Sequence, residues 1–343
     1  MVEERTVAER LKAQALAGRP LRDPAAVAER LLAIQGQDPR GARLAVRVRT
    51  RATSAADVDR ALSDDRTLLI TWLNRGTLHL VRSEDYPWLH ALTAPRLLTA
   101  NARRLAEEGV TPRAAERGVR TIVNALAEEG PLTRLQLRER LDATGVRTEG
   151  QALIHLLMLS TLQGHTVRGP MIGRQHAYVL VGDWLAPSKP VDRDLALAEL
   201  ARRYLAGHAP AGERDLARWA GLPLRDARAG LEAIAPELKQ RRDGLLQLEG
   251  QSLKAAIPPP RLLGSFDPLL LGWESRGPIV GAHKALVTTN GLFRPFALVD
   301  GRAAAIWRLS DGKVSIEPFG TLAAGVRAAL DAEAADVAHF LSG

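Results

Sequence analysis

Two glutamines, Gln35 and Gln37, stand one residue apart in the stretch "LLAIQGQDPRGARLAVRVRTR", which runs from Leu31 to Arg51. An amide side chain offers hydrogen-bond donors and an acceptor, but it does not take up a proton near pH 7. Two neighbouring amides are therefore poor general bases, and they are better suited to orienting a water molecule. The simpler alternative is that they satisfy unpaired backbone carbonyl groups at the end of a helix.

Arginines follow the glutamines at close intervals. Asp38 and Pro39 together form a good helix start, so we expect a helix here, although the apolar residues between the arginines also alternate as in a strand. Arginine makes up 41 of the 47 basic residues, and the formal net charge is +8. Because arginine presents a fork of donors to phosphate groups, a polyanionic partner is expected. In a helix, one face would carry Arg40, Arg43, Arg47 and Arg51.

Composition limits the remaining possibilities. A chain of 343 residues is too long for one ordinary core, and 46% hydrophobic with 25% charged residues is typical of a globular protein. The absence of cysteine excludes disulfides, thiol nucleophiles and thiolate metal sites, and the eight histidines have no metal-ligand spacing. We expect no metal and no cofactor. No apolar run is long enough to span a bilayer and the N-terminus is charged, so a cytoplasmic location is expected.

The N-terminal part is predicted to contain three helices and a β-ribbon. The first helix starts at Asp23 and Pro24 and is expected to end at Gly36. The second starts at Asp38, and the third is capped by Ser54. The run "TLLITWLNRGTLHLV" then predicts two strands joined by a tight turn. Three helices followed by a ribbon are the layout of a winged helix.

The same order of elements recurs twice further along the chain. An offset of 79 residues aligns Pro131 with Pro210 and Leu137 with Leu216, and it also pairs Leu159 with Leu238. This predicts a duplicated unit of three helices and a wing. The fold class is therefore α+β and mainly helical, with three tandem winged-helix units.

After "IPPPRLLG" the chain changes character. Short apolar runs with turn signals predict a small β-barrel-like domain, and an amphipathic helix closes the chain. Asp300-Gly301 and Asp311-Gly312 are predicted hairpin turns. Several residues of chemically active types are expected to have structural roles: Asp267 as a turn former rather than a general base, and His155, Trp219 and Trp273 in packing.

Six stretches of the chain together resemble one family, the winged-helix DNA glycosylases of the AlkZ and YcaQ type. They are "IQGQDPRGA", "TWLNRGTLHLV", "GPMIGRQHAYVL", "RDLARWAGL", and the pair "LLGSFDPLLLGW" and "RPFALVDGRAAAIWR". The resemblance spans nearly the whole chain. It implies three tandem winged helices and a C-terminal β-barrel, arranged in a C around duplex DNA, and it supports a helix after Pro39.

The resemblance also implies a catalytic site. The family's motif of two glutamines falls on Gln35 and Gln37, which places the chain in the AlkZ-like branch. Gly36 stands between them, where the family usually has an aliphatic residue, and glycine gives the backbone more freedom there. No lysine lies beside the motif to form a Schiff base. The implied activity is that of a monofunctional glycosylase for N7-alkylguanine, tolerant of bulky natural-product adducts, with interstrand crosslinks as a further candidate substrate. Such an activity would serve base-excision repair and self-resistance to alkylating antibiotics.

The expected partner is double-stranded DNA carrying alkylated guanine, bound by a monomer in the nucleoid. Arg40, Arg43 and Arg47 are expected to contact phosphates, with Arg75 and His79 as the next candidates. The alternative is a non-enzymatic winged-helix transcriptional regulator, since winged helices occur widely in such proteins. The expected domains are three winged helices, the first with a helical extension, and the barrel-like domain with its C-terminal helix: 1–112, 113–187, 188–256 and 257–343.

Overall fold

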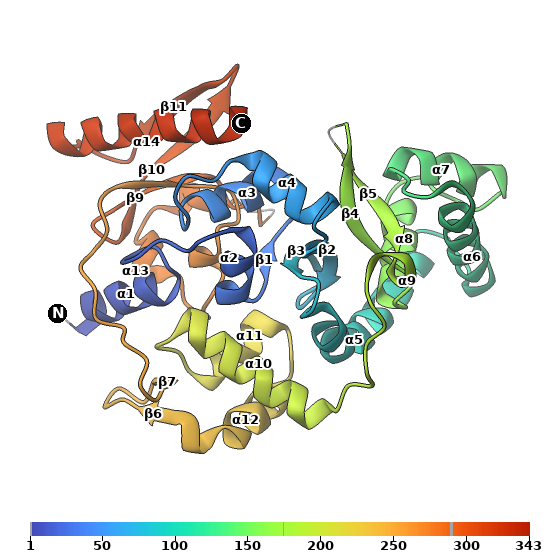
Figure 1. Cartoon of the computed structure of the whole chain (residues 1–343), viewed down its shortest axis with the longest axis horizontal. Coiled ribbons are helices and arrows are strands. Elements are labelled where there is room, and N and C mark those ends of the chain that lie inside the picture. Colours follow the sequence, from blue (N-terminus) through green and yellow to red (C-terminus); the bar gives the residue numbers. More distant parts are fainter. Residues whose placement is uncertain (1, 174, 289–290) are drawn as a thin grey trace. The chain divides into compact units, whose positions relative to one another are not determined.

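The computed structural model describes residues 2–173, 175–288 and 291–343. About half of the chain is helical, and the fold class is α+β as predicted. The chain packs as two compact units, one made of residues 1–58 and 197–343 and the other of residues 59–196. Among the described residues, no helix is long and apolar enough to cross a membrane. Figure 1 shows the elements in their chain order.

The helices and strands up to the middle of the chain are α1 (Val2–Ala13), α2 (Pro24–Leu31), β1 (Ile34–Gln35), α3 (Pro39–Arg47), α4 (Ala55–Ser63), β2 (Leu68–Leu73), β3 (Thr77–Arg82), α5 (Tyr86–Glu107), α6 (Pro112–Glu129), α7 (Arg134–Ala143), α8 (Ala152–Leu162), β4 (Thr166–Ile172), β5 (Gln175–Leu180) and α9 (Val181–Trp184).

The later elements are α10 (Arg193–His208), α11 (Glu213–Ala220), α12 (Leu224–Ala233), β6 (Leu238–Gln240), β7 (Leu246–Leu248), β8 (Arg261–Leu263), α13 (Gly277–Val280), β9 (Phe296–Val299), β10 (Arg302–Ser310), β11 (Lys313–Pro318) and α14 (Ala324–Ser342), with three short 3₁₀ turns at Ala235–Glu237, Pro268–Leu270 and Lys284–Leu286.

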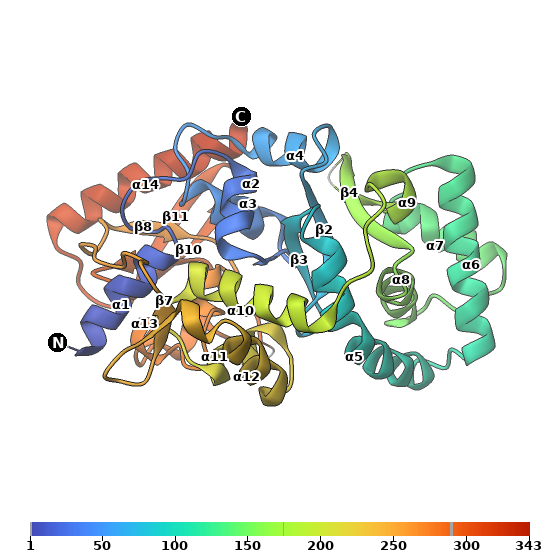
Figure 2. The same ribbon diagram turned by 60° about the horizontal axis from the view of Figure 1, so that its bottom comes forward.

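The unit of residues 59–196 is built on an antiparallel sheet. Its strands follow the order β3-β2-β4-β5, and α5, α6 and α8 pack beside them. Figure 2 shows α6, α7 and α8 gathered next to the β4–β5 hairpin. Ile122, Leu137 and Leu156 are fully buried in the core of this unit. The predicted ribbon is confirmed, because β2 and β3 pair in register around the turn at Asn74–Gly76.

The predicted internal repeat is confirmed over its first half. Leu132 pairs with Tyr178 in an isolated antiparallel bridge, and Ala211, 79 residues later, pairs in the same way with Leu246. The helices that follow, α7 and α11, start at the same offset. The offset does not extend to Leu159 and Leu238, because the first lies in α8 and the second begins β6. The connection before α8 (144–151) is longer than the one before α12 (221–223), so one offset cannot hold through both.

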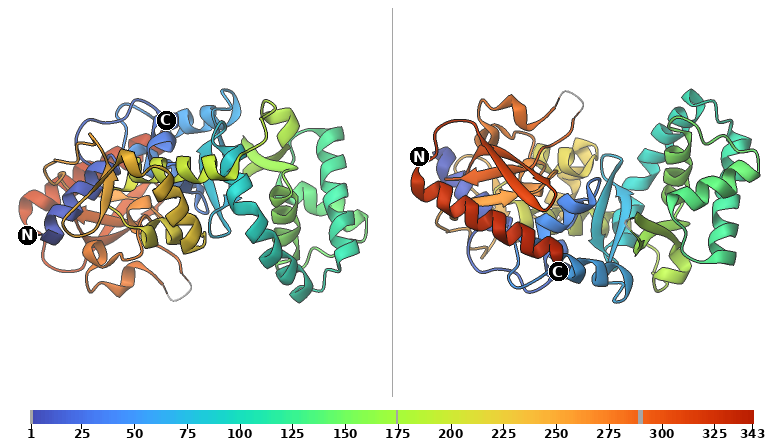
Figure 3. Two further views of the ribbon diagram at one scale, coloured as in Figure 1. Left: turned by 90° about the horizontal axis from the view of Figure 1, so that it is seen from below. Right: turned by 90° about the horizontal axis from the view of Figure 1, so that it is seen from above.

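The C-terminal strands form an open sheet and not the expected barrel. The order is β11-β10-β9-β8, and no closed barrel is found in the described part of the chain. Helix α14 packs against both edge strands, β8 and β11, and the right-hand view of Figure 3 shows it lying over the sheet. In a closed barrel, the edge strands β8 and β11 would be paired with further strands. Here α14 packs against both edge strands instead. The hairpin turns at Asp300-Gly301 and Asp311-Gly312 are confirmed, and all four residues have a positive φ.

Candidate active site

The two glutamines lie on an extended segment between α2 and α3. Helix α2 ends at Leu31 because Leu32 takes a positive φ of 64°, so the prediction that Gly36 ends this helix is wrong. The chain instead extends through β1, which contains Gln35. Residues two apart on an extended chain point to the same side. Consistent with this, Nε2 of Gln35 donates a hydrogen bond to Oε1 of Gln37 over 2.6 Å.

The two amides differ in exposure. Gln35 is 6% exposed, whereas Gln37 lies at the surface. The hydrogen bond from the buried Gln35 amide therefore restrains the side-chain oxygen of Gln37. The exposed Gln37 amide can contact solvent or a ligand. The hydrogen bond thus joins the two side chains to each other. Gly36, between the two, is not one of the described glycines with a positive φ.

Helix α3 begins directly after Gln37. The side chain of Asp38 accepts a hydrogen bond from the Arg40 backbone N–H over 3.0 Å, and Pro39 occupies the first helical position. The predicted helix is thus confirmed, with both sequence signals acting as expected. Because Asp38 adjoins Gln37, the N-terminus of α3 determines where the exposed amide lies.

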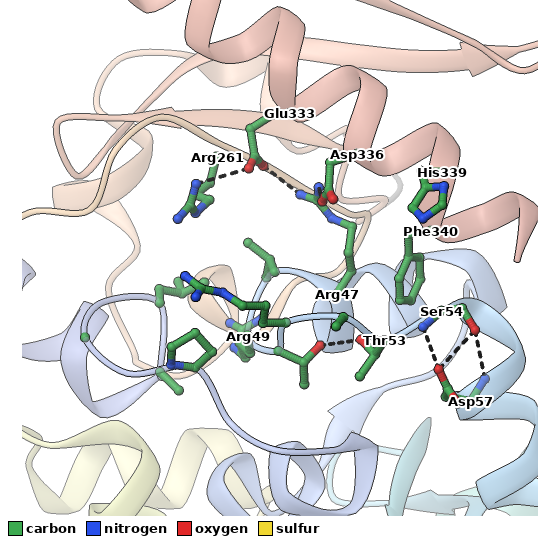
Figure 4. Close-up of a pocket in the computed structure, with 18 residues that line it drawn as sticks. Arg47, Arg49, Thr53, Ser54, Asp57, Arg261, Glu333, Asp336, His339 and Phe340 are labelled. Atoms are coloured by element: carbon green, nitrogen blue, oxygen red, sulfur yellow. Dashed lines mark hydrogen bonds and ion pairs between the residues drawn. The ribbon is translucent and has the colours of Figure 1, made fainter.

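The predicted DNA-contacting arginines of α3 have different environments. Arg40 is exposed, whereas Arg43 is 7% exposed and donates to the Pro39 carbonyl oxygen over 2.8 Å. Arg47 is 6% exposed, and its guanidinium group lies between two carboxylates of α14. Its Nη2 lies 2.7 Å from Oε2 of Glu333, and its Nη1 lies 2.6 Å from Oδ2 of Asp336. All three residues line a cavity of about 630 Å³. Figure 4 shows these side chains in that cavity.

The remaining two predicted residues belong to the β2–β3 hairpin in the other unit. Arg75 is exposed in the turn, and His79 is 3% exposed on β3. Nδ1–H of His79 donates to the Thr77 carbonyl oxygen over 2.9 Å. Burial, assisted by the positive charge of Arg75, lowers the pKa of His79 to about 3. A neutral imidazole is therefore expected throughout the physiological range.

A second histidine has the same property. His208, on α10, is fully buried and stacks on Tyr204 with ring centroids 4.6 Å apart. Burial lowers its pKa to about 3. The predicted packing roles of Trp219 and Trp273 are confirmed, since both are buried around this histidine. His155 is part-buried, and its Nδ1 lies 2.7 Å from Oδ1 of Asn101.

These two histidines give the stability a specific pH dependence. Below pH 6.5 the unfolded chain takes up protons on both imidazoles and the folded chain does not, so the free energy of unfolding falls as the pH falls. The expected slope is about 1.4 kcal/mol per pH unit for each histidine at pH values well below 6.5. Urea unfolding between pH 7 and 5 measures it, and in the variant carrying both His79→Gln and His208→Gln the slope should become much shallower. An unchanged slope would contradict the burial of neutral imidazoles.

Sequence reasoning missed a buried ion pair of Arg49. Arg49 and Asp267 have fully buried side chains that form a bidentate ion pair, with both N–O distances 2.9 Å. Asp267 also accepts from the Leu269 backbone N–H over 2.9 Å, which confirms it as a turn former. The partners are 218 residues apart, so no local pattern indicated the pair.

Comparison with known proteins decides the family. The family model described as "DNA glycosylase AlkZ-like" matches residues 28–340, which is most of the chain. The chain belongs to the AlkZ-like DNA glycosylase family. This confirms the resemblance noted in the sequence, and it makes the protein a DNA glycosylase. The family match gives no support to a non-enzymatic regulator.

This AlkZ-like chain is similar to a curated protein and to a solved structure, both from Streptomyces sahachiroi. A curated protein named "Interstrand DNA cross-link repair glycosylase" is 29% identical, and the match covers 96% of this chain and 94% of the relative. The solved structure of the S. sahachiroi DNA glycosylase AlkZ superposes with a TM-score of 0.77 at 26% identity, covering 98% of this chain and 96% of that one.

Proposed function

We propose that this glycosylase is monofunctional and hydrolyses the N-glycosidic bond of N7-alkylguanine in duplex DNA. The observation that carries the proposal is the hydrogen-bonded pair of Gln35 and Gln37, one amide buried and one exposed. Alkylation at N7 makes guanine cationic and a good leaving group, so no strong acid is needed to expel it. A water molecule must then be placed against the anomeric carbon, where positive charge develops.

The amide pair suits that task. A preorganised amide oxygen can accept a hydrogen bond from the attacking water and face the developing charge. Because neither amide is charged, the site does not hold the cationic lesion in a tight ion pair before it reacts. The bond between the two side chains supports this role, since it restricts the rotamers of the exposed amide.

The proposed lesion range rests on the sequence around the pair. An enzyme that flips its target base stacks that base between aromatic or apolar side chains in a closed pocket. No aromatic residue precedes Trp72 in the sequence. We therefore expect little demand for flipping and tolerance of bulky N7-guanine adducts. The name of the S. sahachiroi relative, which refers to crosslink repair, supports including interstrand crosslinks.

We interpret the helix–helix–helix–hairpin segments as three winged helices that bind the duplex, with domains at 1–112, 113–187 and 188–256 followed by 257–343. The two isolated bridges, at Leu132 and Ala211, support the second and third of these units, since each adds a strand between the first two helices. The repeated α-helices and wings suit contact with a DNA backbone. We propose a monomer acting in the nucleoid.

The direct test is base release. Incubation with N7-methylated duplex DNA should yield free 7-methylguanine, measured by chromatography, and a bulky N7-guanine adduct in the same duplex context should also be released. A protein that only binds DNA would release neither base. Release of the methylated base alone would contradict the open site and leave the glycosylase activity intact.

The different environments of the α3 arginines predict different effects on DNA binding. Arg40→Ala removes an exposed cation, so affinity for undamaged duplex should fall on every sequence, and the slope of log affinity against log salt should flatten by about 0.9. Arg47→Ala removes a guanidinium group already neutralised by Glu333 and Asp336, so the slope should stay unchanged while the protein becomes less stable. Fluorescence anisotropy at several salt concentrations measures both. Equal slope changes in the two variants would contradict this division.

A further inference from the structure

The loop of residues 264–267 packs closely against the N-terminal end of helix α3. A Cβ atom added at Gly41 would lie less than 3.0 Å from the Ser265 carbonyl oxygen. From the other side, a Cβ at Gly264 would lie 2.9 Å from Cβ of Leu44 and 3.0 Å from the Gly41 carbonyl oxygen. The two backbones therefore touch directly, which only glycine permits. This contact is four residues beyond Gln37.

The same loop is also connected, through an ion pair of Asp267 with Arg49, to the C-terminal end of α3. Asp267 bonds to Arg49, and Arg49 also donates to the carbonyl oxygen of Ala45 in the last turn of α3, over 2.9 Å. Its two other N–H groups donate to the backbone and side-chain oxygens of Gln14. All five donors of this guanidinium group are thus used inside the protein.

Between these contacts the loop adopts an unusual backbone conformation. Phe266 has a φ of 56° although it is not a glycine, and its ring lies 5.6 Å from that of Phe293. A left-handed conformation at such a residue persists only where the surroundings determine it. Here the Gly41 contact and the Asp267 ion pair flank it, so the loop is held from both sides.

We propose that residues 264–267 form a clamp that sets the position of α3 and, through it, of the exposed amide of Gln37. Gly41, Arg49 and Asp267 are then positioning residues, and none of them needs to touch the substrate. The clamp explains why a C-terminal segment packs its backbone against the helix that follows the glutamines. The inference rests on the proposed catalytic role of Gln37.

Gly41→Ala tests the clamp, because the added methyl group must push the Ser265 backbone away. Alanine has a higher helix propensity than glycine, so a weaker helix would not explain a loss. We expect the single-turnover excision rate of 7-methylguanine to fall at least tenfold, with affinity for undamaged duplex unchanged. In a Gln37→Ala background the same change should have no further effect, since the group being positioned is absent.

The matched control is Gly325→Ala, in helix α14, where an added Cβ would have no atom within 4 Å. It makes the same glycine-to-alanine change in a helix without a steric conflict, and it lies outside the three proposed winged helices. This variant should keep the wild-type excision rate. If Gly41→Ala does not fold by circular dichroism, Gly264→Ala introduces the same conflict from the loop side.

The outcomes separate the two proposals. A wild-type rate in Gly41→Ala, an equal loss in Gly325→Ala, or a full additional loss in the Gln37→Ala background would each overturn the clamp. A wild-type rate in Gln37→Ala would instead overturn the proposed catalytic role, whatever Gly41→Ala does.

Discussion

Gln37→Ala is expected to slow excision of 7-methylguanine by about 10²-fold or more without abolishing DNA binding, the usual cost of removing one preorganised polar group from such a site. Gln37 is the exposed member of the pair and carries the oxygen to which Gln35 donates. Gln35→Ala should also slow excision, because the exposed amide then loses the bond that orients it. Single-turnover release of the base measures both effects.

The double variant makes the result more specific. Since the two amides act on one water molecule, Gln35→Ala and Gln37→Ala together should cost less than the product of the single effects. Gln163→Ala, which removes an exposed amide after α8, is the matched control and should leave the rate unchanged. Wild-type rates in both single variants would show that the pair is not catalytic.

Asp267→Ala is expected to lower the free energy of unfolding by about 3–5 kcal/mol, since it leaves the Arg49 guanidinium group buried without its counter-charge. Urea denaturation at pH 7 measures the change. The matched control is Glu317→Ala, which breaks an exposed ion pair with Arg308 and should cost about 1 kcal/mol or less. Equal losses in the two variants would contradict the structural importance of the buried pair.

Local signals in the sequence predicted much of the fold correctly. Helix α3 starts where Asp38 and Pro39 indicate, and the hairpin turns at Asp300 and Asp311 form as expected. The repeat offset holds from Leu132 to α7, where loop lengths agree. These features depend on hydrogen bonds and φ preferences within a few residues, which a sequence pattern records directly.

Features that depend on distant partners were predicted less well. The three arginines of α3 share one pattern in the sequence, yet Arg47 pairs with acidic residues 286 and 289 positions away and Arg40 is exposed. Helix α2 ends at Leu31 although no glycine or proline marks the place. The sequence of the C-terminal segment predicted a barrel-like domain. Its strands instead form an open sheet, and α14 packs against both edge strands of that sheet.

The sequence by itself determined that two amides stand two residues apart before a capped helix, and six stretches of it indicated the family that the family model then confirmed. Only the tertiary structure decided that Gln35 is buried while Gln37 is exposed, and that Arg49 pairs with Asp267. The physical reason is that spacing along the chain fixes which side chains can face the same way. Burial and charge pairing depend on which remote segments pack against them, and those segments lie hundreds of residues away.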